Sequence, residues 1–212
     1  MIRNYDKFDL YYRNILDEVY GQAPDAGHTA WSVKALDLVI PHKEEISTVL
    51  DIGCGQGFMR QYFERISLSA TWTGIALGTD FQVMSLNKFP NIYEMDMSFL
   101  DFPDASFDLI YARHTLEHSP FPLITLKEWH RVSSKYLLVV APAPEYWGYK
   151  GKNHYSVMQK EHLEWLFDLS GWKVDTYEVM ELRDTLYQQY EHMDITDLNK
   201  HTPVEHRFLC HK

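Results

Sequence analysis

A buried-strand pattern that runs directly into a glycine-rich turn is the feature that most constrains the fold of this chain. Val49, Leu50 and Ile52 supply the aliphatic surface of an interior parallel strand. Glycine then occupies alternate positions 53, 55 and 57. Glycine adopts positive φ at no steric cost and has no Cβ, so such a loop turns sharply and lets a ligand contact bare backbone. The pattern predicts a small-molecule pocket, although a tight turn without a ligand also satisfies it.

The residues after the turn narrow the ligand class. Phe58, Tyr62, Phe63 and Ile66 recur at helical spacing, so strand, turn and helix are contiguous. In an open α/β sheet, ligands bind beyond the carboxyl ends of the strands, where such turns lie. A dinucleotide fingerprint requires a third glycine where this chain has Phe58, and no phosphate-binding G-x-x-x-x-G-K-[ST] loop occurs. The pattern therefore argues against nicotinamide, flavin and ATP.

The run D-I-G-C-G-Q-G at residues 51–57 resembles the first motif of the class I S-adenosylmethionine (SAM) dependent methyltransferases of the small-molecule type. The resemblance covers most of residues 48–180. It implies SAM as cofactor, S-adenosylhomocysteine as product, and an α/β, Rossmann-like fold. That fold is a seven-stranded, mostly parallel sheet of order 3-2-1-4-5-7-6, with an antiparallel last strand and helices on both faces.

The pattern of the chain agrees with this fold. From residue 48 onward, short apolar runs alternate with amphipathic stretches, as in a parallel sheet covered by helices. We expect a single domain over 1–212, with a two-helix N-terminal cap at 1–45, a cofactor-binding core at 46–180, a polar excursion at 181–204 and a final strand at 205–211. The predicted strands are 48–52, 71–76, 91–95, 107–112, 135–141, 172–179 and 206–211, and the predicted helices are 57–67, 79–88, 119–131 and 159–170.

Composition limits the partners. The chain has 20 Lys and Arg against 30 Asp and Glu, a formal net charge of −10, which argues against a nucleic-acid partner because phosphate binding depends on basic residues. Two cysteines give no disulfide framework, and neither a signal-peptide pattern nor a membrane span is recognisable. We expect a cytoplasmic protein with a small-molecule substrate and no nucleic-acid or membrane partner, and the oligomeric state is not predicted.

The resemblance carries over to individual cofactor-binding residues. In the first motif, Asp51, Gly53, Cys54, Gly55 and Gly57 match positions that face the methionine part of SAM. Asp51 either orients the loop or the cofactor's ammonium, or ties down the turn.

After the second strand, the family usually places an acid that takes both ribose hydroxyls, but this chain reads Gly74-Ile-Ala-Leu-Gly78. Ala76 stands at the acid position and Leu77 follows it. Asp80 either substitutes for the missing acid or stabilises a helix dipole as a first-turn acid, and the sequence favours the second role.

Two further segments match the family. The segment Glu94–Ser98 places Asp96 where an acid accepts from the adenine amino group, with Met97 packing on the ring. An exposed loop acid and a core methionine are the alternative. Arg113 and His114 follow the fourth predicted strand and are implied to lie beside the sulfonium. This strand does not end in the Asn-Pro-Pro-Tyr type of motif found in methyltransferases that act on nucleic-acid bases.

Three histidines are candidates for a catalytic base, namely His114, His118 and His154, because histidine titrates in the right range. A structural role is the alternative for each. His114-Thr-Leu-Glu-His118 also fits the zinc-peptidase pattern H-x-x-E-H. A predicted strand precedes the pattern and Ser119-Pro120 follows it, which argues against the long helix such a site needs. We therefore expect no metal site, although 11 histidines leave an incidental one open.

The acceptor pocket is expected to form from segments above the sheet, namely the N-terminal cap, the aromatic and polar segment 142–158 and, as a further candidate, the excursion 181–204. Trp147, Tyr149 and Tyr155 either line that pocket or pack as a lid. The leading hypothesis is methyl transfer from SAM to a small molecule. Ala76 motivates a second one, a catalytically weak or inactive methyltransferase-like binding protein, and an enzyme that uses SAM for other chemistry is a third.

Overall fold

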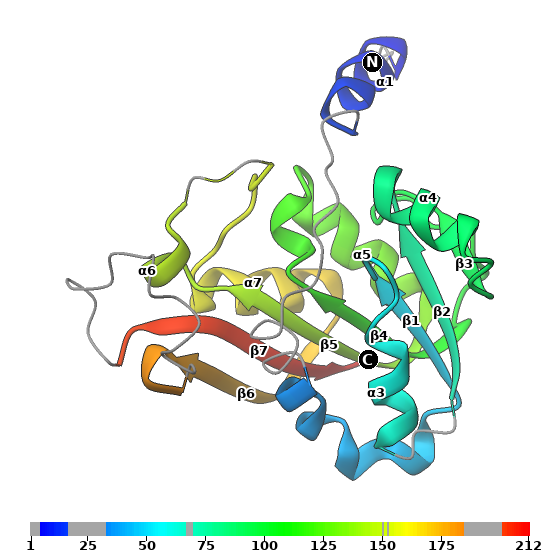
Figure 1. Ribbon diagram of the computed structural model, residues 1–212. Helices are drawn as coiled ribbons and strands as arrows, with labels where there is room; N and C mark the ends of the chain where they lie inside the picture. The colour runs from blue at the N-terminus through cyan, green and yellow to red at the C-terminus, as the bar shows by residue number, and fades with distance from the viewer. Residues whose placement is uncertain (1–4, 17–32, 67–69, 150, 152, 185–200) are drawn as a thin grey trace.

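The computed structural model describes residues 5–16, 33–66, 70–149, 151, 153–184 and 201–212, and its centre is one twisted sheet (Figure 1). The strand order is β3-β2-β1-β4-β5-β7-β6, as predicted. β7 runs antiparallel to both of its neighbours, whereas the other pairs are parallel. The strands are β1 (Thr48–Ile52), β2 (Thr71–Ala76), β3 (Ile92–Glu94), β4 (Phe107–Arg113), β5 (Ser133–Pro142), β6 (Lys173–Glu181) and β7 (Pro203–His211).

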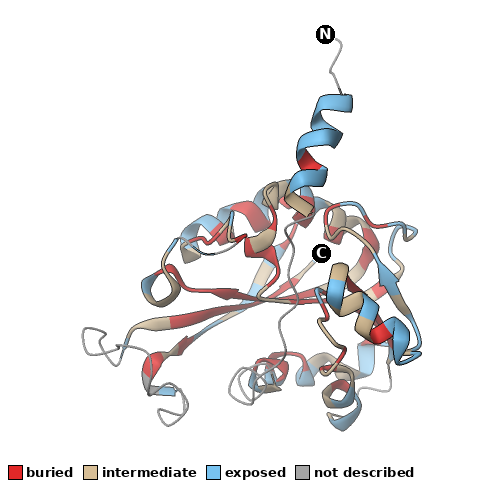
Figure 2. Cartoon of the chain, turned by 45° about the horizontal axis from the view of Figure 1, so that its top comes forward, coloured by how far each residue is buried: buried red, intermediate tan, exposed pale blue. Residues whose placement is uncertain are grey.

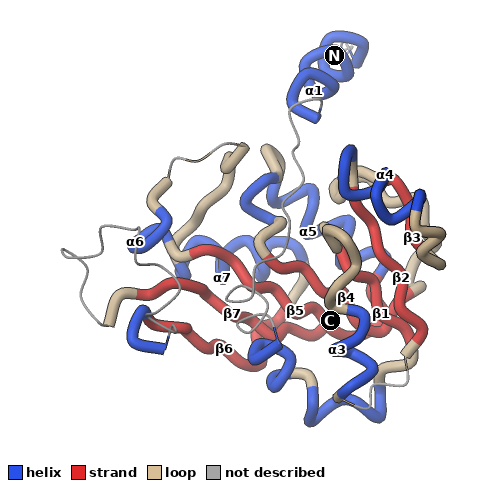
Figure 3. The backbone as a smooth tube through the Cα atoms, viewed as in Figure 1, coloured by secondary structure: helices blue, strands red, loops and turns tan. Residues whose placement is uncertain are grey.

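The sheet separates two apolar layers because side chains alternate along each strand. In β4, Ile110 and Ala112 face the layer that contains Trp129 and Phe167, whereas Leu109 and Tyr111 face the other. Figure 3 shows helices on both sides of the sheet, and Figure 2 shows that the buried residues follow the strands. The helices of the core are α3 (Arg60–Arg65), α4 (Gly78–Leu86), α5 (Pro122–Val132), α6 (Pro144–Trp147) and α7 (Lys160–Ser170), with the 3-10 turn η3 at Leu116–His118.

The predicted N-terminal cap is partly observed. Its first helix is α1 (Tyr5–Leu16), which stands out from the sheet in Figure 1. In the described end of the second stretch, residues 33–35 are α-helical and lead into two 3-10 turns, η1 (Leu36–Leu38) and η2 (Ile40–Glu45), so the α-helix does not continue to residue 45. Pro41 at the start of η2 has no N–H to continue an α-helical ladder.

Parts of two predicted segments lie outside the described ranges. These are 17–32 of the cap and 185–200 of the excursion before β7. The 3-10 turn η4 (Leu182–Asp184) is the described start of that excursion. Within the described residues, every helix is too short or too polar to cross a bilayer.

Candidate active site

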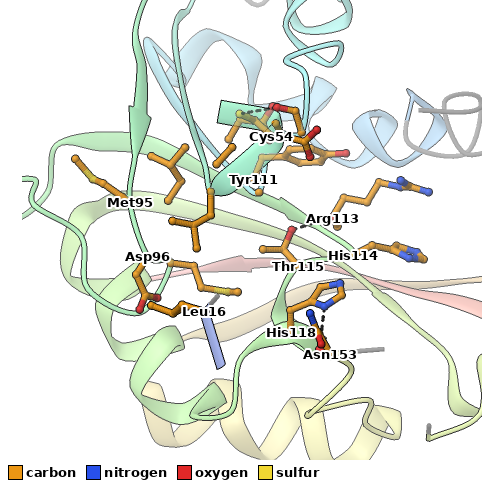
Figure 4. Close-up of a pocket in the computed structure, with 18 of the residues that line it drawn as sticks. Leu16, Cys54, Met95, Asp96, Tyr111, Arg113, His114, Thr115, His118 and Asn153 are labelled. Carbon is orange, nitrogen blue, oxygen red and sulfur yellow. Dashed lines mark hydrogen bonds between the residues drawn. The ribbon is translucent and has the colours of Figure 1, made fainter. Parts of the chain in front are cut away.

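A pocket opens at the carboxyl ends of β1, β2 and β4, where the sequence predicted one (Figure 4). Register explains its position, because Ile52 of β1 pairs with Ile75 of β2 and Ala112 of β4, so the three strands end side by side. The walls are mostly apolar, with a few convergent polar groups, as is usual for small-molecule sites. The lining includes Tyr12, Asp51, Gly53, Cys54, Gly55, Ala76, Leu77, Asp80, Asp96, Met97, Arg113, His114, Thr115, His118, Asn153 and Tyr155.

The glycine turn is held tightly at its first position. Gly53 N and Cys54 N both donate to Ile75 O at 3.0 Å. A Cβ on Gly53 would lie 2.4 Å from Thr115 Oγ1, and that hydroxyl donates to Ile52 O at 3.1 Å. Only glycine allows β1 and the loop after β4 to approach this closely.

The other two glycines of the turn have different surroundings. Gly55 has φ of +53°, and the space beside its Cα is open toward Asp80, whose Oδ2 would lie 3.9 Å from an added Cβ. Gly55 therefore presents bare backbone to the pocket. Gly57 is not a lining residue. A Cβ added to Gly57 would lie 3.0 Å from the Phe89 ring, which is outside the lining too.

Asp51 lies at the base of the pocket and is buried. Its Oδ2 accepts a hydrogen bond from Trp72 Nε1 at 3.2 Å, so the carboxyl group ties β1 to β2. Burial raises the pKa of Asp51 to about 7, against the smaller opposing effect of the Trp72 bond. The Trp72 contact supports the structural role considered for Asp51, in which the carboxylate ties down the turn. Because Asp51 also lines the pocket, it is placed for the second role, orienting the cofactor's ammonium.

At the end of β2, Ala76 and Leu77 both line the pocket, and Asp80 joins them from the first turn of α4. Asp80 therefore faces the same space as the position where an acid is missing. The sequence favoured the role of a first-turn acid that stabilises the helix dipole. The structure shows that Asp80, in that first turn, also lines the pocket.

Asp96 and Met97, which follow β3 in the chain, also line the pocket. Asp96 Oδ1 accepts from Ser98 N at 2.8 Å, which fixes the carboxylate in a turn. Tyr12 of α1 reaches the same carboxylate, and burial together with the Asp96 hydrogen bond raises the pKa of the phenol. Met97 also packs against the core beside α5, and its carbonyl accepts from Trp129 Nε1 at 2.9 Å.

Arg113 and His114 lie at the end of β4 and are joined to a buried acid of β7. Glu205 is fully buried, and its Oε1 lies 3.2 Å from Arg113 Nη2 and 2.9 Å from His114 Nε2. Its other oxygen lies 3.2 Å from Arg207 Nη2. Burial acts to raise the pKa of Glu205, but the His114 hydrogen bond and the two arginine charges outweigh it and hold that pKa well below its usual range.

The three candidate histidines have different environments. His114 has φ of +47° and is tied to Glu205. His118 Nδ1 lies 2.9 Å from Asn153 O, and burial lowers the pKa of His118 to about 4. His154 lies beside His118, with ring centroids 4.9 Å apart, and burial lowers its pKa as well. His114 and His118 line the pocket, whereas His154 is outside the lining.

The three aromatic candidates of segment 142–158 were expected either to line the pocket or to pack as a lid, and they differ in their positions. Trp147 donates to Val204 O at 3.0 Å and packs near Met180 and Leu182. It does not line the pocket itself, but its ring lies edge-on to that of the lining residue His114, with ring centroids 5.7 Å apart. Tyr149 is exposed, and only Tyr155 of the three aromatic candidates lines the pocket.

Several residues of the site were not predicted from the sequence, among them Tyr12, Thr115 and Glu205. Tyr12 belongs to the stripe of α1 that packs on Phe121, so its amphipathic spacing was a usable signal. Glu205 at the start of the predicted last strand was a second signal, because a carboxylate buried in a sheet requires a partner. Thr115 carried no comparable signal, since its role depends on contact with Gly53.

Comparison with known families matches residues 50–136 to a family described as a methyltransferase domain. Over these residues the chain carries a methyltransferase domain, which agrees with the resemblance to class I SAM-dependent methyltransferases. The matched segment contains β1, the glycine turn and β4, so the methyltransferase motifs lie on the walls of the pocket. No curated protein matches the sequence significantly.

Solved structures share the fold of this methyltransferase domain. A SAM-dependent methyltransferase from Archaeoglobus fulgidus has a TM-score of 0.67 at 19% identity, covering 99% of this chain and 100% of that one. One from Mesorhizobium loti has a TM-score of 0.60 at 17% identity, with 84% and 98% covered. The [4+2]-cyclase SpnF has a TM-score of 0.65 at 18% identity, with 98% and 94% covered. At these identities the likeness establishes the fold.

Proposed function

We propose that this methyltransferase transfers a methyl group from SAM to a small-molecule acceptor. The observation that carries the proposal is that the residues matched to the family's cofactor motifs, which lie at or after the ends of β1, β2, β3 and β4, converge on one pocket, with Gly57 the exception. The acidic net charge of −10 supports a small molecule over a nucleic acid as acceptor. The two cysteines are separate buried thiols, which supports a reducing, cytoplasmic location.

We assign the cofactor to the residues around the glycine turn. The backbone at Gly53 and Gly55 holds the amino-acid end, the Asp96 carboxylate accepts from the adenine amino group, and Met97 packs on the ring. SAM supplies an already activated methyl group on its sulfonium. The chain's own residues therefore have to position the acceptor in line with that group and exclude water.

The alternative is a binding protein that has lost catalysis, which Ala76 motivates because the ribose acid is missing there. Incubating the purified protein with methyl-labelled SAM and a metabolite extract separates the two functions. Label transferred to a small molecule supports the enzyme. Binding of S-adenosylhomocysteine by calorimetry, with no label transferred from any extract, supports the binding protein, and absence of both contradicts the proposed function.

We predict that Asp80 replaces the missing ribose acid. Asp80→Ala should weaken SAM binding by about ten- to a hundredfold, because a hydrogen bond to a charged group contributes roughly 1.5–3 kcal/mol. Calorimetry on both proteins measures this change. Glu161→Ala is the matched control, because Glu161 is also a first-turn acid but lies exposed on α7. If Asp80→Ala lowers only thermal stability and leaves SAM affinity intact, Asp80 serves the helix dipole instead.

A further inference from the structure

Glu117 is a buried acid whose carboxyl oxygens accept no hydrogen bond from the described part of the chain. It lies in η3 with 1% of its surface exposed, and among the described residues neither carboxyl oxygen has a hydrogen-bond partner. His114 Nδ1 lies 3.8 Å from Oε1, beyond hydrogen-bond distance. Burial of a polar group without a hydrogen bond is costly, so each such group calls for an explanation.

Two histidines lie beside this carboxyl group. One potential ligand atom each from Glu117, His118 and His154 lies within 4.8 Å of the others. Glu117 and His118 are neighbours in η3, whereas His154 comes from the loop between α6 and α7. The loop is fixed to η3 by backbone hydrogen bonds, because Tyr155 N and Ser156 N both donate to Glu117 O, at 2.8 and 2.9 Å. The cluster is therefore part of the folded architecture.

The orientation of His118 suits a metal ligand. Its Nδ1 lies 2.9 Å from Asn153 O, a carbonyl that only accepts, so Nδ1 carries the proton and the lone pair resides on Nε2. Metal-binding histidines commonly donate their second ring N–H to a backbone carbonyl in this way. Asn153, which directly precedes His154, adopts a left-handed conformation with φ of +61°. The carbonyl that orients His118 therefore belongs to the same turn as the His154 ligand.

Gly151 makes room for the third ligand. A Cβ at this position would lie 2.6 Å from His154 Nδ1 and 2.9 Å from its Cγ. A larger residue would displace the imidazole from its place beside His118. The loop is thus shaped around the His154 ring.

We propose that Glu117, His118 and His154 form a binding site for one divalent transition-metal ion. Two imidazole nitrogens and one carboxylate oxygen are a donor set that binds zinc, manganese and iron(II) and leaves coordination positions for water or substrate. In the H-x-x-E-H pattern the two histidine ligands would be His114 and His118. In the proposed site they are His118 and His154, and Glu117 is the third ligand. His114 is held by Glu205, and residues 116–118 form a 3-10 turn with no long helix.

The position of the site suggests its use, which rests on the proposed function. His118, Asn153 and Tyr155 all line the pocket, so the ion would lie at the pocket wall. A bound cation lowers the pKa of a coordinated hydroxyl. The acceptor class is then a small molecule with a metal-binding hydroxyl group. Its proton leaves to water, the O–CH₃ bond forms and the S–CH₃ bond of SAM breaks, releasing S-adenosylhomocysteine.

Titration of the chelator-treated full chain with Mn²⁺, followed by electron paramagnetic resonance, tests the site. We expect one bound Mn²⁺ per chain, displaced by Zn²⁺. Glu117→Gln and His154→Ala should each weaken Mn²⁺ binding by more than about tenfold, because even partners of metal ligands contribute roughly ten- to a hundredfold. His162→Ala is the matched control, since His162 lies exposed on α7, and its Mn²⁺ affinity should equal that of the unmodified protein.

Calorimetry with S-adenosylhomocysteine on the same proteins separates this proposal from the proposed function. Retained affinity shows that the variants are folded, and His154→Ala, on a partly exposed side chain, serves if Glu117→Gln does not fold. Absence of Mn²⁺ and Zn²⁺ binding by the unmodified protein overturns the metal site, as does equal affinity in His154→Ala. Metal binding without any binding of S-adenosylhomocysteine leaves the site standing and overturns the cofactor assignment.

Discussion

Replacing Gly55 by valine is expected to abolish SAM binding while the fold persists. Gly55 has φ of +53°, where a β-branched residue is strained, and an added side chain enters the pocket beside Asp80. The isopropyl group would occupy the space where the cofactor's amino-acid end contacts backbone. Calorimetry with S-adenosylhomocysteine should detect no binding at millimolar ligand, whereas circular dichroism should remain that of the unmodified protein.

Gly148→Val is the matched control for backbone strain. Gly148 has φ of +68°, a Cβ added there would meet no atom of the described residues within 4 Å, and its position is outside the pocket lining. Valine is strained at Gly148 as well, because φ of +68° with ψ of 178° is a conformation that only glycine favours, but the side chain does not enter the cofactor space. S-adenosylhomocysteine affinity should therefore be retained in this variant. Retained affinity in Gly55→Val would place the cofactor elsewhere and remove the central support for the proposed function.

Glu205→Gln is expected to lower the free energy of unfolding by about 3–5 kcal/mol, the usual effect of removing one partner of a buried ion pair. The amide keeps the shape of the side chain but leaves the charges of Arg113 and Arg207 without the Glu205 counter-charge in the interior. Urea unfolding at pH 7 measures the loss. A change below about 1 kcal/mol would mean that the charges are not coupled as the geometry indicates.

The effect of Glu205→Gln should also depend on pH in a defined direction. The folded pKa of Glu205 lies below its ordinary value of 4.5, so the unfolded state binds more protons as the pH falls below that value. The stability contributed by Glu205 is complete above about pH 4.5 and is lost as the pH approaches the folded pKa. The difference between the two proteins should therefore shrink between pH 5 and pH 3, and a difference that stays constant would contradict this account.

Asp175→Asn serves as the control for a surface pair. Asp175 lies 2.6 Å from His211, but both side chains are about one third exposed. Such pairs contribute about 0.2–1 kcal/mol because water screens them. The comparison shows whether burial, and not ion pairing as such, makes Glu205 important.

The core of the fold was predictable from local pattern. β1 and β2 were located to the residue, because Val49–Ile52 and the run before Gly78 combine buried-strand composition with glycine turns. Where local pattern was weaker, the prediction was less accurate. β3 has three residues because only Ile92, Tyr93 and Glu94 pair with β2, and the expected second N-terminal helix ends in 3-10 turns around Pro41.

By itself, the sequence determined the strand-turn-helix unit at residue 53, the likeness to SAM-dependent methyltransferases and the strand order that this likeness implies. These features depend on near neighbours in the chain, where glycine conformation and side-chain periodicity act directly. The tertiary structure alone decided which distant residues meet, such as Glu205 with Arg113, or His154 with Glu117 and His118. Those contacts arise from strand pairing and loop docking between segments tens of residues apart, which no local pattern encodes.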